Sequence, residues 1–187
     1  MDFYLFLDFE TEGLDVSVDR MLEVGWVLTD SDLREVGNGS ALFKVPGPLR
    51  MNSFVTDMHE KSGLLADLAD PEVDKFNLYE VEHSINALVD SVVKDGETVR
   101  LAGSGVGFDM KFIESRLPNL RARLHYQIMD TSVVRRFLRD VCGLGAPELV
   151  GADKTEGLTE HRAWDDAEMA RRELLRYREF VRKAVGE

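Results

Sequence analysis

The arrangement of apolar segments along the chain constrains the fold more than any other feature of the sequence. Residues 3–9 and 21–29 are rich in aromatic and aliphatic side chains, and residues 41–45 form a third short apolar run. After a loop that reaches Ser62, helical and strand patterns alternate. The expected helices cover 78–93, 108–117 and 131–141, the further strands cover 98–102 and 126–129, and a last long helix begins near residue 160. This order predicts an α/β fold in which α-helices flank both faces of a mixed β-sheet.

The length of the chain suits one domain. At 187 residues it can bury one core but is short for two, so a single domain over 1–187 is expected. The glycine-rich stretch 143–159 has the least pattern and is expected to be a mobile loop beside the functional site. No apolar run approaches the roughly 18 residues of a membrane helix, and the first residues do not resemble a signal peptide. These features predict a cytoplasmic protein without a membrane partner.

The net charge of −12 limits the partners that the protein can bind. A protein that binds long nucleic acid normally presents a basic surface that neutralises phosphates. We therefore expect this chain to bind long polyanions poorly. The acidic residues either form an ordinary solvated surface or gather to hold cations, and composition alone leaves both open.

Asp8 and Glu10 form the first candidate site. They stand two residues apart at the end of an apolar strand, so the two-residue period of a strand directs both side chains to one face. Taken alone, an Asp-x-Glu pair is more often a solvated strand end than a site. Two further acidic segments support the functional interpretation.

Asp109 follows a glycine-rich segment that comes directly after the strand at 98–102. It lies at the start of a helix, where a carboxylate also interacts favourably with the helix dipole. The glycines do not form a dinucleotide-binding GxGxxG motif, because position 108 is Phe, and no P-loop motif occurs. They instead let the backbone approach another backbone segment or a small ligand beside Asp109.

The third acidic segment, His161 to Asp166, leads into the last helix. At 100° per residue, Asp166 lies about 60° from the centre of the apolar stripe of this helix, whereas Asp165 lies about 160° away and faces water. A carboxylate at the edge of a buried stripe is costly unless it is paired or binds a metal, so Asp166 is the candidate ligand. For His161, a surface position and a catalytic role are equally compatible with the local sequence.

The three segments together resemble the DEDDh exonucleases. The matching motifs are LDFET at 7–11, GFD at 107–109 and HRAWDD at 161–166. Within that superfamily the chain is most similar to the oligoribonucleases, over the blocks LDFETEGLD, MHEKSGLL, LPNLRARLHYQIMDTS and HRAWDDAEMARRELLRYREF. This resemblance implies an RNase H-like fold, a homodimer, and 3′–5′ removal of nucleotides from short RNA, with dinucleotides as preferred substrate.

The resemblance also implies roles for the acidic residues. Asp8, Glu10 and Asp166 are expected to hold two divalent ions, Asp109 completes the second ion site, and His161 is the general base. The residue types suit this chemistry, since hard oxygen ligands bind Mg²⁺ or Mn²⁺. Two such ions activate a water molecule and neutralise charge on the phosphate, while a histidine can take the proton of the water.

Substrate contacts are implied in the same way. Leu14 corresponds to a wedge between two bases, and Phe54 stands where the family usually has a tryptophan that stacks on a base. Without the resemblance, a core contact for Leu14 and a loop anchor for Phe54 would be favoured. The remaining expected substrate contacts are Ser104, His125, Tyr126 and Ser132.

Two positions depart from the family pattern. Gln127 replaces an arginine, and Gly105 replaces a serine, both of which help to cap the 5′-phosphate of the substrate. Loss of a fixed cation weakens phosphate recognition. We therefore expect the protein to accept a wider range of short oligomers as substrates, or not to require a 5′-phosphate on them. Comparable rates on phosphorylated and unphosphorylated dinucleotides would support this expectation.

Three other functions remain open from the sequence. The chain could be an exonuclease acting on the 3′ ends of longer RNA or DNA, although its acidity argues against this. It could be a non-catalytic module that binds a nucleotide or a protein. A metal-stabilised structural domain would bind ions without turnover.

Overall fold

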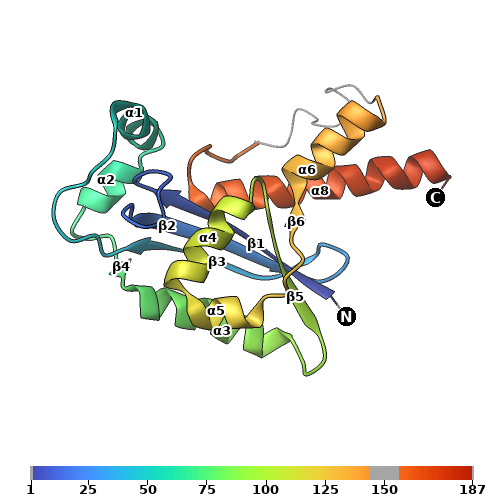
Figure 1. The fold of residues 1–187 in the computed structure, drawn as a ribbon, viewed down its shortest axis with the longest axis horizontal. Helices are drawn as coiled ribbons and strands as arrows, with labels where there is room; N and C mark the ends of the chain where they lie inside the picture. The colour runs from blue at the N-terminus through green and yellow to red at the C-terminus, as the bar shows by residue number, and fades with distance from the viewer. Residues whose placement is uncertain (1, 144–155, 187) are drawn as a thin grey trace.

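A six-stranded mixed sheet forms the centre of the computed structural model, which describes residues 2–143 and 156–186 (Figure 1). The strands are β1 (Asp2–Thr11), β2 (Met21–Thr29), β3 (Glu35–Phe43), β4 (Lys75–Phe76), β5 (Thr98–Gly103) and β6 (Met129–Asp130). They lie in the order β4-β3-β2-β1-β5-β6. The β1–β2 and β2–β3 pairs are antiparallel, and the β1–β5, β3–β4 and β5–β6 pairs are parallel.

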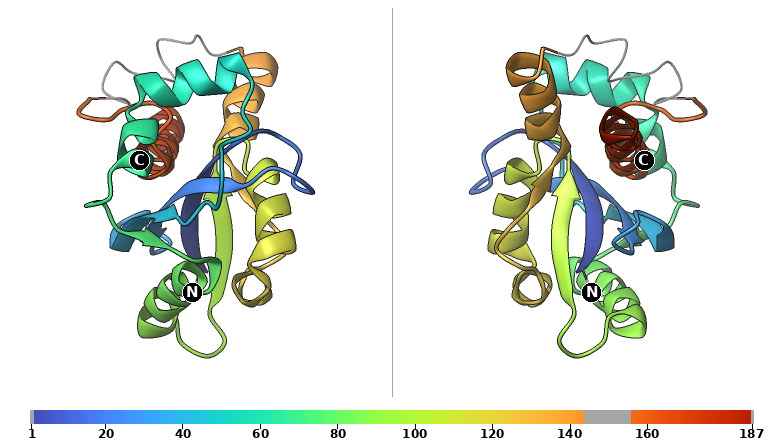
Figure 2. Two further views of the ribbon diagram at one scale, coloured as in Figure 1. Left: turned by 90° about the vertical axis from the view of Figure 1, so that its left-hand side faces the viewer. Right: turned by 90° about the vertical axis from the view of Figure 1, so that its right-hand side faces the viewer.

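Helices cover both faces of the sheet, as predicted. One face carries α3 (Leu78–Val92), α4 (Gly107–Arg116) and α5 (Pro118–Arg123), and the other carries α8 (Ala163–Val185). Figure 2 shows α8 on one side of the strands and α4 and α5 on the other. The alternation of β1 explains both layers, because Leu5 and Leu7 pack into the core with α3, α4 and α5, whereas Phe6 packs against Ala167 and Ala170 of α8.

Several predicted elements are confirmed to within one residue. They are the helix at 78–93, which is α3, the strand at 98–102, which is β5, and the helix at 108–117, which is α4. The start of α3 is fixed by a capping box, in which Asn77 accepts a hydrogen bond from the Glu80 amide and the Glu80 carboxylate accepts one from the Asn77 amide.

The prediction that the chain is loop-like up to Ser62 is wrong. This region contains α1 (Ser53–Lys61), and α2 (Leu64–Ala69) follows it. Asn52 caps α1 by accepting a hydrogen bond from the Val55 amide at 2.9 Å. In α1 only His59 is buried, so no apolar stripe reveals the helix in the sequence.

The boundaries of two strands also differ from the prediction. β3 begins at Glu35 rather than at 41, because pairing with β2 stabilises residues that are mostly polar and partly exposed. The strand expected at 126–129 is confined to Met129–Asp130, which pair with Ala102 and Gly103 of β5.

The helices of the C-terminal part begin and end differently as well. Pro118 ends α4 as expected but also begins α5, where its missing N–H costs no hydrogen bond. The helix expected at 131–141 consists of α6 (Thr131–Arg136) and a π-helical turn, η1 (Phe137–Val141). The last helix begins at Ala163 rather than near 160, since His161 has a positive φ of 64°.

Most of the stretch 143–159, expected to be a mobile loop, lies outside the described residues. None of the helices that the structure describes combines the length and the apolar character required to cross a bilayer.

Candidate active site

Asp8 and Glu10 lie near the carboxyl end of β1, on the face of the sheet that α8 covers. They belong to the same alternate set of positions as Phe6, which packs against α8. Asp8 is paired with Gly25 of β2 and Glu10 with Glu23. Asp8 is half-buried, and the Glu10 side chain is buried.

The absence of a side chain at Gly25 lets the start of α8 approach the sheet. A Cβ atom at this position would lie 2.0 Å from the Trp164 amide nitrogen. Next to it, the Glu23 carboxylate accepts hydrogen bonds from the Ala163 amide at 3.0 Å and from Arg162 Nη2 at 2.9 Å. These contacts fix the first turn of α8 beside Asp8 and Glu10.

His161 and Asp166 flank this first turn. The His161 amide donates a hydrogen bond to Asp166 Oδ2 at 2.8 Å, with the His161 backbone in the left-handed region. Asp166 is half-buried and His161 is exposed. The expectation that Asp165 faces water is only partly right, because Asp165 is also half-buried and accepts a hydrogen bond from the Thr159 amide at 2.9 Å.

Asp109 reaches the same region from α4. It lies in the first turn of that helix, is buried, and accepts a hydrogen bond from the Phe9 amide at 3.1 Å. Because Phe9 stands between Asp8 and Glu10, this bond fixes Asp109 next to both carboxylates.

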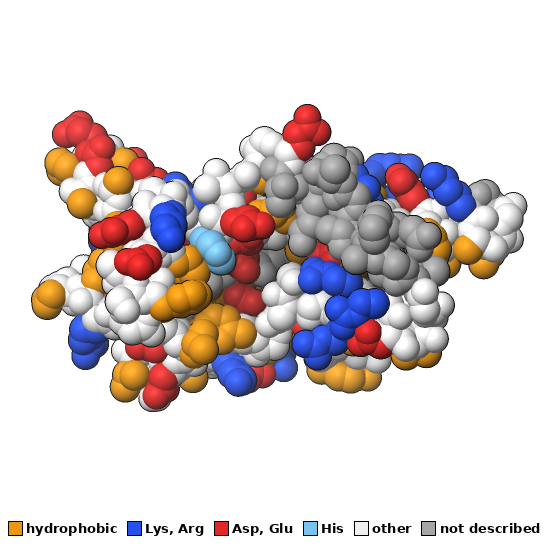
Figure 3. All heavy atoms as spheres, turned by 90° about the horizontal axis from the view of Figure 1, so that it is seen from above, with side chains coloured by type: hydrophobic (Ala, Val, Ile, Leu, Met, Phe, Trp, Pro, Cys, Tyr) orange, Lys and Arg blue, Asp and Glu red, His pale blue; other side chains and the backbone are white. Residues whose placement is uncertain are grey.

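A hollow of about 360 Å³ opens above these residues. It is lined by Asp8, Ser104, Glu160, His161, Asp166, Met169 and Ala170, and is called the acidic hollow below. Ligand atoms of Glu10, His161 and Asp166 lie within 4.8 Å of one another. Figure 3 shows acidic side chains and a histidine gathered around a depression on this face.

Burial dominates the electrostatics of the four carboxyl groups, and repulsion within the group adds to it at Asp8 and Glu10. Burial, with a further contribution from the charge of Asp166, raises the pKa of Glu10 to about 8. Burial also raises the pKa of Asp109 to about 7 and that of Asp166 to about 6. The pKa of Asp8 lies well above its usual value, because of burial and then of the charges of Asp109, Glu10 and Asp166. A cation bound among these groups relieves this repulsion.

The donor set fits a hard divalent cation. Carboxylate oxygens are the preferred ligands of Mg²⁺ and Mn²⁺. The neighbouring cation Arg162 does not neutralise the cluster, since its guanidinium is engaged by Glu23 and, at 2.8 Å, by Asp67. The arrangement can therefore hold divalent ions beside a histidine.

Leu14 and Phe54 are both exposed. Leu14, in the connection between β1 and β2, is 84% exposed, which excludes the core contact considered from the sequence. Phe54, in the first turn of α1, is 75% exposed and lines a hollow together with Lys61, Glu160 and His161. Both residues present apolar surface to solvent, and Phe54 does so next to His161.

The structure brings Ser104 to the acidic hollow and Ser132 near it. Ser104 lines the hollow directly. Ser132, in the first turn of α6, donates its hydroxyl to Asp130 Oδ1 at 2.6 Å, and the Gly105 amide donates to the same oxygen at 3.1 Å. Asp130 thus links the ends of β5 and β6 to α6.

His125 and Tyr126 are not brought to the acidic hollow of their own chain. The His125 amide donates to the Val99 carbonyl at 2.8 Å, and Val99 pairs with Phe3 at the opposite end of β1 from Glu10. Tyr126 is exposed. Any contact of these two residues with a substrate in the acidic hollow therefore needs a second copy of the chain.

Sequence reasoning missed His59 and the pair of Glu23 and Arg162. His59 is fully buried in α1, with Nε2 at 3.0 Å from the Thr11 carbonyl and Nδ1 at 3.7 Å from Glu10 Oε2. The block MHEKSGLL contains His59, but its partners are distant in sequence, as are Glu23 and Arg162 from each other. No local pattern points to contacts of this kind.

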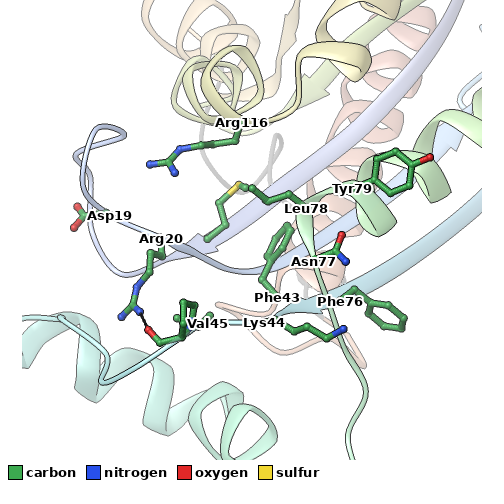
Figure 4. A pocket seen from close by; sticks show the side chains of 12 residues that line it. Asp19, Arg20, Phe43, Lys44, Val45, Phe76, Asn77, Leu78, Tyr79 and Arg116 are labelled. Carbon is green, nitrogen blue, oxygen red and sulfur yellow. Dashed lines mark hydrogen bonds between the residues drawn. The ribbon is translucent and has the colours of Figure 1, made fainter.

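A second pocket, of about 430 Å³, shares no lining residue with the acidic hollow (Figure 4). Its walls are mainly the apolar side chains Met21, Phe43, Val45, Phe76, Leu78 and Tyr79, and it is called the apolar pocket below. Arg20, Lys44 and Arg116 also line it. None of the expected site residues takes part in this pocket.

Comparison with known proteins identifies relatives over nearly the whole chain. The family model of the RNase T exonucleases matches residues 5–174. An oligoribonuclease of Mycobacterium leprae is 31% identical over 180 residues, which cover 95% of this chain and 80% of the relative. An oligoribonuclease of Corynebacterium efficiens is 33% identical, with coverage of 95% and 78%.

Solved structures share the fold at lower identity. Escherichia coli exonuclease I in complex with an oligonucleotide superposes with a TM-score of 0.68 at 18% identity, over 96% of this chain and 41% of that one. This chain therefore spans about two fifths of exonuclease I. Pop2p of S. pombe, in a form with bound Mg²⁺ and Mn²⁺, has a TM-score of 0.64 at 13% identity, with coverage of 94% and 82%. These similarities establish the RNase H-like fold.

Proposed function

The chain belongs to the RNase T exonuclease family and within it to the oligoribonucleases, and from this membership we propose that it removes nucleotides from the 3′ ends of short RNA with two divalent ions. The products are 5′-mononucleotides. The observation that carries the proposal is the gathering of the carboxylates and His161 at the acidic hollow.

Each residue of the cluster has a proposed role. Asp8, Glu10 and Asp166 would hold two Mg²⁺ or Mn²⁺ ions, and Asp109 would complete the second site. Bound ions supply the charge that activates the attacking water and stabilises the leaving 3′-oxygen. His161 accepts the proton of that water at a ring nitrogen. The hydrogen bond from the His161 amide to Asp166 holds the proposed general base next to the proposed metal ligand.

Leu14 and Phe54 bind the bases in this proposal. Their exposed apolar surfaces suit a wedge between two bases and a stacking partner, respectively. Ser104 and Ser132, near the ends of β5 and β6, contact the sugar-phosphate backbone of the substrate.

We also propose that the chain is cytoplasmic and forms a homodimer. An apolar groove of about 480 Å³ runs between η1 and α8, lined among others by Phe137, Leu138, Leu174 and Val181. Phe137 and Val181 are exposed in the single chain. Burial of this surface against a second copy removes apolar area from water. Sedimentation of Phe137→Glu beside the wild type tests this, since a dimer through this groove predicts a monomeric variant.

The test of the activity is a time course with Mn²⁺. A 5′-phosphorylated RNA dinucleotide is compared with a seven-nucleotide RNA, with Asp8→Ala as control. Rapid cleavage of the dinucleotide and slow loss of the heptamer support the proposal. Equal or faster shortening of the heptamer moves the role towards general trimming of RNA 3′ ends.

The same time course, together with binding and thermal-unfolding measurements, distinguishes the enzyme from the non-enzymatic alternatives. A nucleotide-binding module binds the dinucleotide without cleaving it. A metal-stabilised structural domain gains thermal stability from Mn²⁺ but shows no turnover, and Asp8→Ala removes that gain.

A further inference from the structure

Glu12 comes directly after β1 and is the third carboxylate at that end of the strand, after Asp8 and Glu10. β1 and β2 lose their regular register between Glu10 and Thr11, so the alternation that groups Asp8 with Glu10 does not extend to Glu12. The Glu12 side chain is fully buried. A buried charge is costly unless it is paired and hydrogen-bonded, so the partners of Glu12 indicate what it does.

The carboxylate of Glu12 accepts hydrogen bonds from two segments of the chain. Oε2 accepts from Arg20 Nε at 2.6 Å and from the Arg20 amide at 3.3 Å. Oε1 accepts from Arg20 Nη2 and from the Arg50 amide, the latter at 2.7 Å. A carboxylate has about four acceptor positions, so these bonds leave none for a metal ion. Glu12 instead joins Arg20 and Arg50 to the end of β1.

Arg20 extends this connection to the segment before α1. Its Nη1 donates to the Pro46 carbonyl, and its Nη2 donates to the Pro48 carbonyl at 2.7 Å. Figure 4 shows the Arg20 side chain directed at this segment. Glu12, Arg20 and the backbone of residues 46–50 are called the Glu12 clamp below. Paired bonds between a guanidinium and a carboxylate fix geometry as well as adding stability.

The Glu12 clamp joins the two segments that carry Leu14 and Phe54. Leu14 lies in the connection between Glu12 and Arg20, whose ends are also joined by a bond from the Glu12 amide to the Arg20 carbonyl at 3.0 Å. Phe54 lies in the first turn of α1, shortly after Arg50. Both side chains are exposed, so packing around them does not fix their positions. The backbone of each segment therefore decides where Leu14 and Phe54 lie.

We propose that Glu12 is a positioning residue that, through Arg20 and the Arg50 amide, fixes Leu14 relative to Phe54 and thereby determines how the two bases of a dinucleotide are bound. This inference rests on the proposed function and adds a residue that contacts neither the substrate nor the ions. A displacement of about 1 Å in a substrate-positioning group costs on the order of 10²-fold in rate. A rigid connection between the two segments therefore has a large effect on recognition.

Amide hydrogen exchange in Glu12→Gln tests the connection itself. A glutamine side chain keeps the shape but offers one oxygen and one NH₂ group. Whichever way it is turned, the NH₂ group faces a donor, either Arg20 Nε or the Arg50 amide. We expect exchange of the Arg50 amide, followed by NMR, to accelerate at least about tenfold. Unchanged exchange means that Glu12 does not hold this segment and overturns the inference.

Steady-state kinetics with Mn²⁺ test the effect on recognition. The substrates are an RNA dinucleotide and the same dinucleotide without its 5′ base. In Glu12→Gln we expect KM for the complete dinucleotide to rise about tenfold, with kcat within about twofold. The substrate with one base gives Leu14 no pair of bases to separate, so its kcat/KM falls by less than about threefold. An equal loss on both substrates, or a loss confined to kcat, overturns the inference.

The matched control is Glu82→Gln. Glu82 of α3 is also buried and also accepts bonds from a distant segment, namely from the Asn119 amide at 2.7 Å and the Leu120 amide at 2.9 Å. It joins α3 to α5, so its replacement lowers the melting temperature but leaves the ratio of kcat/KM for the two substrates as in the wild type. An equal fall of this ratio in both variants assigns the effect to general destabilisation and overturns the inference.

Arg20→Lys is a second variant, for the case that Glu12→Gln does not fold. Lysine keeps the buried carboxylate paired with a cation, but a single nitrogen does not reproduce the fork of a guanidinium that spans Glu12, Pro46 and Pro48. We expect the ratio of kcat/KM to fall about threefold. An unchanged ratio overturns the inference. Absence of metal-dependent hydrolysis of both dinucleotides by the wild type is the separate failure of the proposed function.

Discussion

The acidic hollow and the apolar pocket have similar volumes but opposite electrostatics. Around the apolar pocket every cation has a partner. Arg20 is bonded to Glu12, Lys44 Nζ lies 3.6 Å from Glu80, and Arg116 donates to the Val16 carbonyl at 3.0 Å.

In the acidic hollow, by contrast, carboxylates gather, and burial raises the pKa of each, with mutual repulsion adding to it at Asp8 and Glu10. The apolar pocket is explained by packing alone. Uncompensated charge, rather than cavity shape, is therefore what marks the candidate active site.

The largest expected effect is that of Asp8→Asn. It keeps the shape of the side chain but removes a metal ligand, so we expect dinucleotide hydrolysis to fall on the order of 10³-fold. The same change removes a repelling charge, so the metal-free variant melts at a higher temperature than the metal-free wild type. Hydrolysis with Mn²⁺ and thermal unfolding in EDTA measure the two effects. A variant that is less stable in EDTA would contradict the repulsion argument.

Gly25→Ala is expected to lower activity by more than about tenfold, because overpacking displaces the backbone. The new Cβ meets the Trp164 backbone and moves the start of α8, together with His161 and Asp166. Circular dichroism melts and dinucleotide kinetics measure the change. Gly107→Ala is the matched control, since a Cβ there meets nothing within 4 Å. Equal behaviour of the two variants would show that the close approach at Gly25 is unimportant.

The pH dependence of stability is a further way to distinguish the acidic hollow from the apolar pocket. The folded pKa of Glu10, about 8, lies above its ordinary value of 4.5, so folding favours the protonated form. The stability that the protonated Glu10 gives the fold is fully present when the pH is below its ordinary pKa of 4.5. It is lost as the pH rises through the folded pKa of about 8. Melting temperatures in EDTA should therefore fall between about pH 5 and pH 8, with a smaller fall in saturating Mg²⁺. A flat or rising profile in EDTA would contradict the raised pKa of Glu10.

The smallest effect is expected in the apolar pocket. Tyr79 is exposed at its rim, so Tyr79→Ser should keep kcat/KM within about twofold and change the unfolding free energy by about 0.5 kcal/mol or less. Urea unfolding and dinucleotide kinetics measure both. A tenfold loss of activity would show that the apolar pocket takes part in catalysis.

The sequence predicted those features that depend on local periodicity. The strand period placed Asp8 and Glu10 together, and the helical period separated Asp166 from Asp165 as the residue facing the cluster. The mixed sheet followed from the order of apolar segments.

Features that depend on distant contacts were missed. α1 has little apolar face of its own, and His59 acquires its environment from Thr11 and Glu10 of β1. Arg100 and Gln127 meet only because β5 lies next to the segment before β6. Contacts of this kind arise from tertiary packing, and short-range patterns do not encode them.

Two elements far apart in the sequence meet at the acidic hollow, where β1 contributes Asp8 and Glu10 and α8 contributes Asp166. A ribosome synthesises β1 early and α8 late, and α8 docks on the sheet only after its residues have emerged. Until α8 has been synthesised, Asp8 and Glu10 of β1 lack the third carboxylate, Asp166. The carboxylates of β1 and α8 therefore come together only when α8 has docked on the sheet.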